Sequence, residues 1–278
     1  PSGEIAFESM LKGSPDQKYI FGVDPASEVD NFSIVVLEVR GDHRRIVHCW
    51  TTNRQQHKDK LKSKIVDEDD FYSYCAKKIR ELMKAFPCVE IALDAQGGGI
   101  AVMEALHDKD KIPDGEVPIW PVIDENKPKD TDDHSGLHIL RLCQFAKADW
   151  LAEANHGMRK DFEDKVLLFP FFDSASIGLS IEHDKVSGRK YDTLEDCVME
   201  IEELKDELSM IVMTQTATGR ERWDTPEVKV AAGRKSRLRK DRYSSLLMAN
   251  MSARNFITEN RVLEFNTVGG FARRDNNA

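Results

Sequence analysis

The sequence lacks any apolar run that approaches the ~20 residues needed for a membrane-spanning helix. Its first ten residues, PSGEIAFESM, also lack the basic, apolar and small-residue order of a secretory signal. There is no initiator Met, and we expect Pro1 to begin a segment cut from a longer protein. We therefore expect no membrane partner.

Cysteine is scarce, with five residues in a chain of 278, and none of them forms a C-x-x-C pair. The five are Cys49, Cys75, Cys88, Cys143 and Cys197. An odd number without paired spacing argues against a disulfide framework and against a structural zinc site. A reducing cytosol is the simpler setting for such a chain.

Positive charge is also in short supply, because 40 Lys and Arg face 49 Asp and Glu, for a formal net charge of −9. This balance argues against a dedicated nucleic-acid coat protein and against a polybasic membrane binder. It leaves room for a local basic surface. With 40% apolar and 32% charged residues, the chain has enough apolar material for a globular core.

Strand and helix patterns alternate along the first part of the chain. Three dense, β-branched runs predict an antiparallel meander. They are Tyr19–Asp24, Phe32–Val39 and Arg45–Thr51. A helical period follows over Asp67–Phe86, and another strand is predicted at Val89–Asp94.

The alternation continues after a short helix that ends at Leu106. The remaining predicted elements are a strand at Pro118–Val122, a helix at Gly136–Asn155, a strand or buried loop at Val166–Phe172, an amphipathic helix at Thr193–Leu208, hairpin strands at Met210–Thr216 and Arg220–Asp224, and a last helix at Arg239–Phe256. This order predicts an α/β fold, with a mixed β-sheet flanked by helices and an added β-hairpin. We divide the chain into a linker segment at 1–18, one domain at 19–258 and a tail at 259–278.

Two aspartates end apolar strands, and a third begins the last helix. Asp24 stands in GVDPA, Asp94 in IALDAQGGG and Asp241 in RLRKDRYSSLLMA. Taken singly, each is explained as a turn or helix-cap residue. The three glycines after Asp94 permit either a close backbone approach or a flexible turn. A P-loop is excluded, since the chain has no GxxxxGK[ST] motif and no Gly-Lys dipeptide.

Together the three acids indicate a metal site. Clustered carboxylates raise one another's pKa unless cations neutralise them. An oxygen-rich, thiol-free site suits Mg²⁺ or Mn²⁺. Two such ions ~4 Å apart clamp the attacking and leaving oxygens of a phosphodiester. Asp24, Asp94 and Asp241 are therefore our candidate metal-binding and catalytic residues.

The segment Lys229–Arg242 concentrates seven cations around one acid in a chain that is net acidic. Six of these cations are our candidate DNA-binding residues: Arg234, Lys235, Arg237, Arg239, Lys240 and Arg242. Contacts of this kind position the phosphate backbone and carry little sequence preference. The simpler alternative is a solvated basic face.

Other charged clusters are secondary. Glu28 and Asp30 follow Asp24 and are placed to reach a metal through water, although loop acids are more often solvated. His134 and His138 fit the start of a surface helix better than a zinc site. The basic residues between 54 and 64 form a loop that either touches DNA phosphates or is simply solvated.

The order of strands, helices and acids resembles that of a ribonuclease H-like nuclease. The stretches YIFGVDPASEVDNFSIVVLEV, IALDAQGGGIAVMEAL and RKDRYSSLLMA more narrowly resemble the C-terminal nuclease domain of tailed-phage terminase large subunits, from about Tyr19 to Phe256. GVDPA and KDRYSSLL are the more specific parts. By position, Asp24, Asp94 and Asp241 match the three metal-binding acids of that family.

The resemblance also has a departure. Some members of that family carry a second acid or a His beside the third carboxylate. The neighbours here are Arg239, Lys240 and Arg242, which leaves the fourth metal ligand open.

The resemblance implies a metal-dependent DNA endonuclease that uses two Mg²⁺ or Mn²⁺ ions and cuts concatemeric double-stranded DNA with little sequence specificity. The implied partners are double-stranded DNA, a terminase ATPase domain that this chain lacks, the phage portal and the small terminase subunit. The implied setting is the cytoplasm of an infected bacterial host. The alternatives are a junction resolvase or transposase core, and a non-catalytic module that docks on the portal or ATPase.

Overall fold

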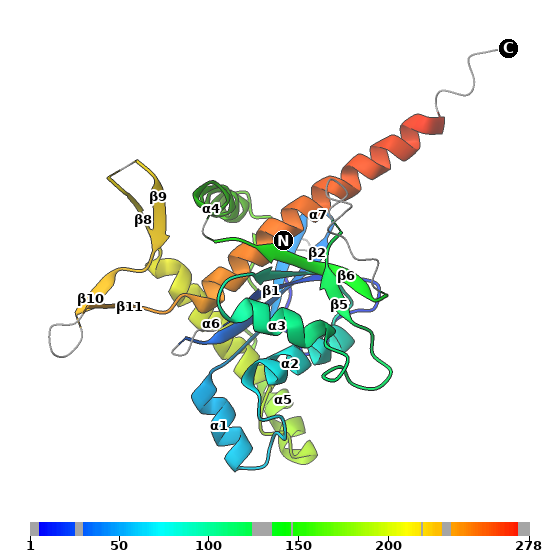
Figure 1. Cartoon of the computed structure of the whole chain (residues 1–278), viewed down its shortest axis with the longest axis vertical. Coiled ribbons are helices and arrows are strands. Elements are labelled where there is room, and N and C mark those ends of the chain that lie inside the picture. The colour runs from blue at the N-terminus through cyan, green and yellow to red at the C-terminus, as the bar shows by residue number, and fades with distance from the viewer. Residues whose placement is uncertain are drawn as a thin grey trace.

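The computed structural model describes residues 6–25, 30–123, 135–145, 147–217, 219–229 and 235–271. A mixed β-sheet lies at the centre of the molecule, with helices on both faces (Figure 1). Within the described part, no helix is both long and apolar enough to cross a membrane.

Seven strands form the central sheet in the order β5-β6-β4-β1-β2-β3-β7. Their bounds are β1 Lys18–Asp24, β2 Phe32–Arg40, β3 His43–Thr52, β4 Cys88–Asp94, β5 Ile119–Pro121, β6 Leu137–Cys143 and β7 Leu167–Leu168. The meander β1-β2-β3 is antiparallel, as predicted, whereas β4 runs parallel to β1 and to β6. The carboxyl ends of β1 and β4 therefore meet at the same edge of the sheet.

Seven helices are described around the sheet. They are α1 Arg54–Lys62, α2 Phe71–Ala85, α3 Gly98–His107, α4 Ala148–Glu163, α5 Ser174–Ser187, α6 Leu194–Met210 and α7 Asp241–Phe271. Two antiparallel ribbons project from the body: β8 Val212–Gln215 with β9 Glu221–Asp224, and β10 Glu227–Lys229 with β11 Lys235–Arg237 (Figure 1). The first ribbon is the predicted hairpin.

The residues of β1 alternate between the two faces of the sheet. Tyr19, Phe21 and Val23 belong to the core shared with α2 and α3, whereas Ile20 belongs to the core shared with α4, α6 and α7. Nearly every residue of β1 and β2 is buried because helices cover both faces. The alternation also determines which side chains point toward α7.

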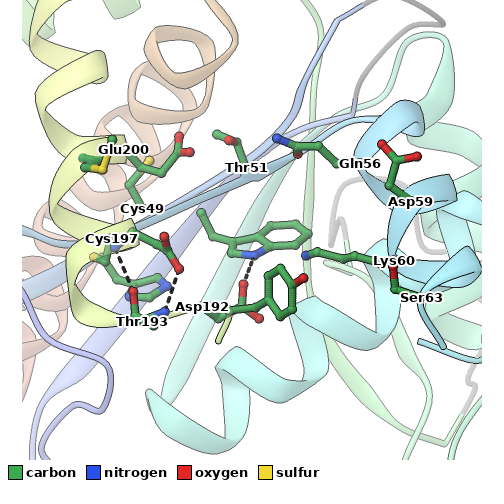
Figure 2. Close-up of a pocket in the computed structure, with 15 residues that line it drawn as sticks. Cys49, Thr51, Gln56, Asp59, Lys60, Ser63, Asp192, Thr193, Cys197 and Glu200 are labelled. Carbon is green, nitrogen blue, oxygen red and sulfur yellow. Dashed lines mark hydrogen bonds between the residues drawn. The ribbon is translucent and has the colours of Figure 1, made fainter. Parts of the chain in front are cut away.

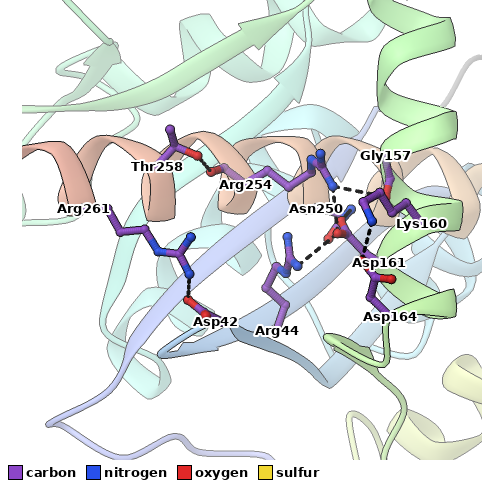
Figure 3. A network of polar contacts seen from close by, with 10 residues as sticks. All are labelled: Asp42, Arg44, Gly157, Lys160, Asp161, Asp164, Asn250, Arg254, Thr258 and Arg261. Carbon is purple, nitrogen blue, oxygen red and sulfur yellow. Dashed lines mark hydrogen bonds and ion pairs between the residues drawn. The ribbon is translucent and has the colours of Figure 1, made fainter.

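A buried polar network holds α7 in place (Figure 3). Asp161 of α4 accepts from Arg44 of β3 at 3.1 Å, from Arg254 of α7 at 2.7 Å and from Asn250 of α7 at 2.8 Å. Further along α7, Arg261 pairs with Asp42 in the turn between β2 and β3. Breaking a buried ion pair leaves an uncompensated charge, so this network strongly favours one position of α7 against β3 and α4.

Several predicted elements differ from the structure. The helix predicted at Gly136–Asn155 is instead β6 followed by α4. Leu137–Cys143 pairs with both β4 and β5, and only Leu140 and Cys143 are buried in that strand. An apolar run of this length fits either a strand or a helix turn, and pairing with two neighbours decides between them.

Local predictions also failed at other points. The basic stretch after Asn53 is the helix α1 rather than a loop, with Asn53 as its N-cap. The segment over α5 was not assigned to any element. We expected the last helix to end at Phe256, but α7 continues to Phe271. His138 lies on β6 rather than on a helix, and both His134 and Glu28 lie outside the described residues.

Candidate metal centre

Asp24 and Asp94 lie at the carboxyl ends of neighbouring parallel strands. In the pairing of β1 with β4, Val23 is opposite Leu93, so the two aspartates come next in each strand. Asp24 lies on the same face of the sheet as Ile20, four positions earlier in β1. Asp94 lies on the same face as Ala92, which packs against Met248 of α7. Both aspartates therefore belong to the face that α7 covers.

Asp241 is the first residue of α7, and Gly22 lets that helix lie close to β1. A Cβ atom at position 22 would stand 1.8 Å from the carbonyl oxygen of Ser245, so only glycine fits there. The backbone N–H of Asp24 donates to Ser245 Oγ at 3.1 Å. The Asp241 carboxylate accepts from the backbone N–H of Asn31 at 2.9 Å. The start of α7 is thus fixed against the ends of β1 and β2.

Asp24 lies within electrostatic reach of the other two acids. Burial raises the pKa of Asp24 well above its usual value, and the negative charges of Asp241 and Asp94 raise it further. A hydrogen bond from the Ser244 side chain opposes this rise. The fold therefore brings into one neighbourhood three carboxylates that come from segments far apart in the chain.

Each of the other two acids also has a raised pKa. Burial raises the pKa of Asp241 to about 6, against the opposing effect of the Asn31 N–H. Burial raises the pKa of Asp94, while the N–H of Gln96 donates to its Oδ1 at 3.1 Å and lowers it. In all three groups burial disfavours the charged form, and neighbouring carboxylates add to this effect at Asp24 and Asp241, while Arg239 opposes it at Asp241.

The donor set fits a hard divalent cation. It consists of carboxylate oxygens, which suit Mg²⁺ or Mn²⁺, and a bound dication would relieve the repulsion that raises the pKa of Asp24. Among the described residues, no three His, Cys, Asp or Glu side chains already stand close enough together to hold an ion. Binding there requires the carboxylates to turn toward a shared position.

A fourth acid lies in the same electrostatic neighbourhood. The negative charge of Asp30 raises the pKa of both Asp24 and Asp241. From the sequence, its position shortly after Asp24 placed Asp30 within reach of a metal through water, with a solvated loop acid as the simpler alternative. The hydroxyls of Ser244 and Ser245 were missed altogether, because nothing in the sequence distinguishes them from other helical serines.

The glycines after Asp94 serve close packing between β4 and α3. Gly97 has a positive φ of 54°, and a Cβ atom at Gly99 would stand 1.8 Å from the carbonyl oxygen of Asp94. A Cβ atom at Gly98 would stand 2.6 Å from the Tyr72 hydroxyl oxygen. These positions explain the glycine run without a bound phosphate.

The six candidate DNA-binding residues divide into different environments. Arg239 donates to the Asn31 side chain at 3.0 Å, beside the carboxylates, and Lys240 pairs with Asp224 of β9 at 3.1 Å. Arg242 is only 8% exposed and is directed into the protein. Lys235 and Arg237 belong to β11, and Arg234 lies outside the described residues.

A separate cavity of about 350 Å³ lies among β3, α1 and α6 (Figure 2). Trp50 donates to Asp192 at 2.7 Å within it, and Glu200 of α6 lies at its edge. None of the three candidate acids lines this cavity. It therefore is not the centre formed by Asp24, Asp94 and Asp241.

No protein-family model matches the chain, and no curated protein matches it in sequence. The structure is similar to the large terminase nuclease from the thermophilic phage G20c with bound magnesium, with a TM-score of 0.52, 13% identity, and coverage of 89% of this chain and 92% of that one. The chain has the terminase nuclease fold. The expected α/β fold, a mixed sheet flanked by helices and carrying an added hairpin, is confirmed.

Two further similarities are weaker. The G20c nuclease with bound cobalt has a TM-score of 0.49, 12% identity, and coverage of 89% of this chain and 92% of that one. The large terminase from a second thermophilic bacteriophage has a TM-score of 0.46 and 8% identity. That match covers 90% of this chain but only 43% of the second phage's longer chain.

Proposed function

We propose that the chain is the metal-dependent DNA endonuclease domain of a phage genome-packaging terminase, which cuts concatemeric double-stranded DNA. The observation that carries the proposal is the meeting of Asp24, Asp94 and Asp241 at one end of the sheet, under the start of α7. Their position on a terminase nuclease fold supports it. The solved structure of the G20c nuclease holds magnesium.

In this proposal Asp24, Asp94 and Asp241 hold two Mg²⁺ or Mn²⁺ ions. When bound, such ions lower the pKa of a water molecule and stabilise the charge on the leaving 3′ oxygen. Asn31 orients the Asp241 carboxylate, and Ser244 orients that of Asp24. Hydrogen bonds of this kind limit how far each carboxylate turns when it binds an ion.

Arg239 and Lys240 directly precede Asp241, and we assign them to the DNA backbone together with Arg234, Lys235 and Arg237. Contacts to phosphates position a duplex without reading its bases, so cutting should show little sequence preference. Arg242 is left out of this set, because its side chain is buried in the protein.

The proposed partners are double-stranded DNA, the terminase ATPase domain, the phage portal and the small terminase subunit. The proposed setting is the cytoplasm of an infected bacterial host. Activity of the isolated chain should be weak, since its net charge of −9 repels DNA and its partners are missing.

A plasmid-nicking assay tests the proposal. We expect cutting with Mn²⁺, less with Mg²⁺ and none with EDTA, and its loss in Asp24→Asn, Asp94→Asn and Asp241→Asn. Cutting that persists in all three variants would remove the mechanism. A preference for branched over linear DNA would favour a junction resolvase or transposase core. A folded chain that never cuts would favour a docking module.

A further inference from the structure

Asn31 lies between the candidate metal centre and the helix α1. Its backbone N–H donates to Asp241 Oδ2 at 2.9 Å, whereas its side-chain oxygen Oδ1 accepts from two other residues. Arg239 Nη1 donates to this oxygen at 3.0 Å, and Asn53 Nδ2 donates to it at 3.3 Å. Asn31 is 7% exposed. One buried residue therefore joins Asp241, Arg239 and the residue that caps α1.

Asn53 determines which end of the Asn31 amide faces outward. The two asparagines lie opposite each other, just beyond the last paired residues of β2 and β3. Asn53 is the N-cap of α1, and its Oδ1 accepts from the N–H of Gln56 at 2.9 Å. Its amide nitrogen therefore faces Asn31, and this nitrogen only donates. Asn31 must present its oxygen to that donor, and the same oxygen is what a guanidinium, which also only donates, requires.

The backbone around Arg239 is restrained as well. The carbonyl oxygen of Leu238 accepts from the Thr225 hydroxyl at 2.8 Å, and Lys240 pairs with Asp224 at 3.1 Å. The residues on each side of position 239 are therefore tied to the end of β9. Arg239 itself is exposed. Its side-chain bond thus holds an exposed guanidinium in a limited set of positions.

A guanidinium held in this way suits a DNA phosphate. Its planar fork of N–H donors matches the oxygens of a phosphate, and it keeps its charge at any physiological pH. Arg239 and Asp241 are both bonded to Asn31, so a phosphate at ions held by Asp241 would lie close to Arg239. A long side chain normally loses conformational freedom when it binds, and a side chain that is already held loses less.

We propose that Asn31 and Asn53 are positioning residues for Arg239. Their amide pair holds the Arg239 guanidinium beside Asp241, where it binds a phosphate of the DNA backbone next to the metal centre. This inference rests on the proposed function, because it assumes that DNA lies against Asp241.

A double-mutant cycle on the 278-residue chain tests it, with affinity for a linear duplex measured by fluorescence anisotropy in EDTA, where no cutting occurs. Asn31→Leu keeps the backbone N–H for Asp241 but removes the side-chain oxygen, and we expect a two- to threefold loss of affinity, on the order of the cost of ordering one arginine. Arg239→Ala should lose about threefold, and the double variant should bind no more weakly than Arg239→Ala alone.

The matched control is Asn260→Leu. Asn260 is half-buried and lies 19 positions after Asp241 on α7, where its side chain bonds only to its own helix among the contacts described. The control should bind the duplex as the wild type does.

The cycle separates the proposal from a purely structural role. If Asn31 served only to join the ends of β2 and β3, the two losses would multiply to about sixfold or more in the double variant, and that result would overturn the proposal. Unchanged affinity in Asn31→Leu would overturn it as well while leaving the nuclease function intact. A wild-type chain that binds no duplex, in EDTA or in Mn²⁺, would overturn both.

A melting curve for each variant reports whether it folds. If Asn31→Leu does not fold, Asn53→Ser takes its place, because serine keeps an N-cap oxygen for the Gln56 N–H but lacks the amide donor. We then expect a loss of about twofold that is absent when Arg239 is already alanine. Wild-type affinity in Asn53→Ser would count against the proposal.

Discussion

Gly22 of β1 lies against the carbonyl oxygen of Ser245 in α7, so closely that a Cβ atom would stand 1.8 Å from it. The same helix turn places Ser245 Oγ within 3.1 Å of the Asp24 N–H. Backbone contact between the strand that carries Asp24 and the helix that carries Asp241 is what brings the two acids together.

Gly22→Ala should therefore push α7 off the sheet. We expect a loss of about 3 kcal/mol in the free energy of unfolding, measured by urea denaturation, because the backbone of Ser245 cannot yield as a side chain would. Gly178→Ala, in α5 with open space around it, is the matched control and should be neutral or slightly stabilising. A variant at position 22 as stable as the wild type would mean that the two backbones are not in contact.

Asp24→Asn should stabilise the metal-free protein at neutral pH. A carboxyl with a raised pKa keeps its proton in the folded chain after the unfolded chain has lost it, so stability falls as pH rises above the usual value of 3.8. The asparagine does not titrate and avoids this cost. We expect a rise of about 3 °C in Tm at pH 7 and a smaller difference at pH 4.

Addition of Mn²⁺ should reverse that ranking, since a cation that binds only the folded wild type raises its Tm. Asp173→Asn is a useful contrast. Asp173 caps α5 and its pKa is lowered, so its replacement should reduce stability instead. A Tm for Asp24→Asn below that of the wild type without metal would indicate that Asp24 is a structural cap.

His48 should make the protein sensitive to mild acid. Burial lowers the pKa of His48 from 6.5 to about 4, and its Nδ1 lies 3.0 Å from the carbonyl oxygen of Met10. Below pH 6.5 the imidazole of His48 binds a proton in the unfolded chain but stays neutral in the folded chain. The free energy of unfolding therefore decreases as pH falls toward 4. The lowered pKa of His48 corresponds to ~3 kcal/mol of stability lost once both states are protonated.

His48→Gln should remove this part of the acid dependence, as measured by urea denaturation at several values between pH 7 and pH 4. His183→Gln, at an exposed position on α5, should keep the wild-type dependence. Parallel stability curves for the wild type and His48→Gln would show that His48 is not held neutral.

Arg239→Ala should weaken binding to linear duplex DNA by about threefold, equally across sequences, and reduce the slope of affinity against salt by about one. Arg239 contacts Asn31, whose N–H holds Asp241, so it lies beside the three acids. Lys185→Ala, on the exposed surface of α5, is the control that removes one charge elsewhere. A loss confined to particular sequences, measured by fluorescence anisotropy, would contradict a phosphate contact.

The sequence alone determined the meander, the hairpin at Val212–Asp224 and the strand that ends at Asp94. Each is a local pattern in which dense β-branched or alternating residues are bounded by turns, and β1, β2 and β3 pair with their immediate neighbours in the chain. The positions of Asp24 and Asp94 at strand ends followed from the same patterns.

Only the tertiary structure decided where the remaining side chains point. In the sequence, Arg242 is one more cation of a basic segment. In the structure it pairs with Glu200 and Glu207, which lie 42 and 35 positions earlier, on another helix. The run Leu137–Cys143 became a strand because β4 and β5 offered it hydrogen bonds on both sides. Local sequence specifies backbone preference, whereas burial and charge pairing depend on residues that only folding brings into contact.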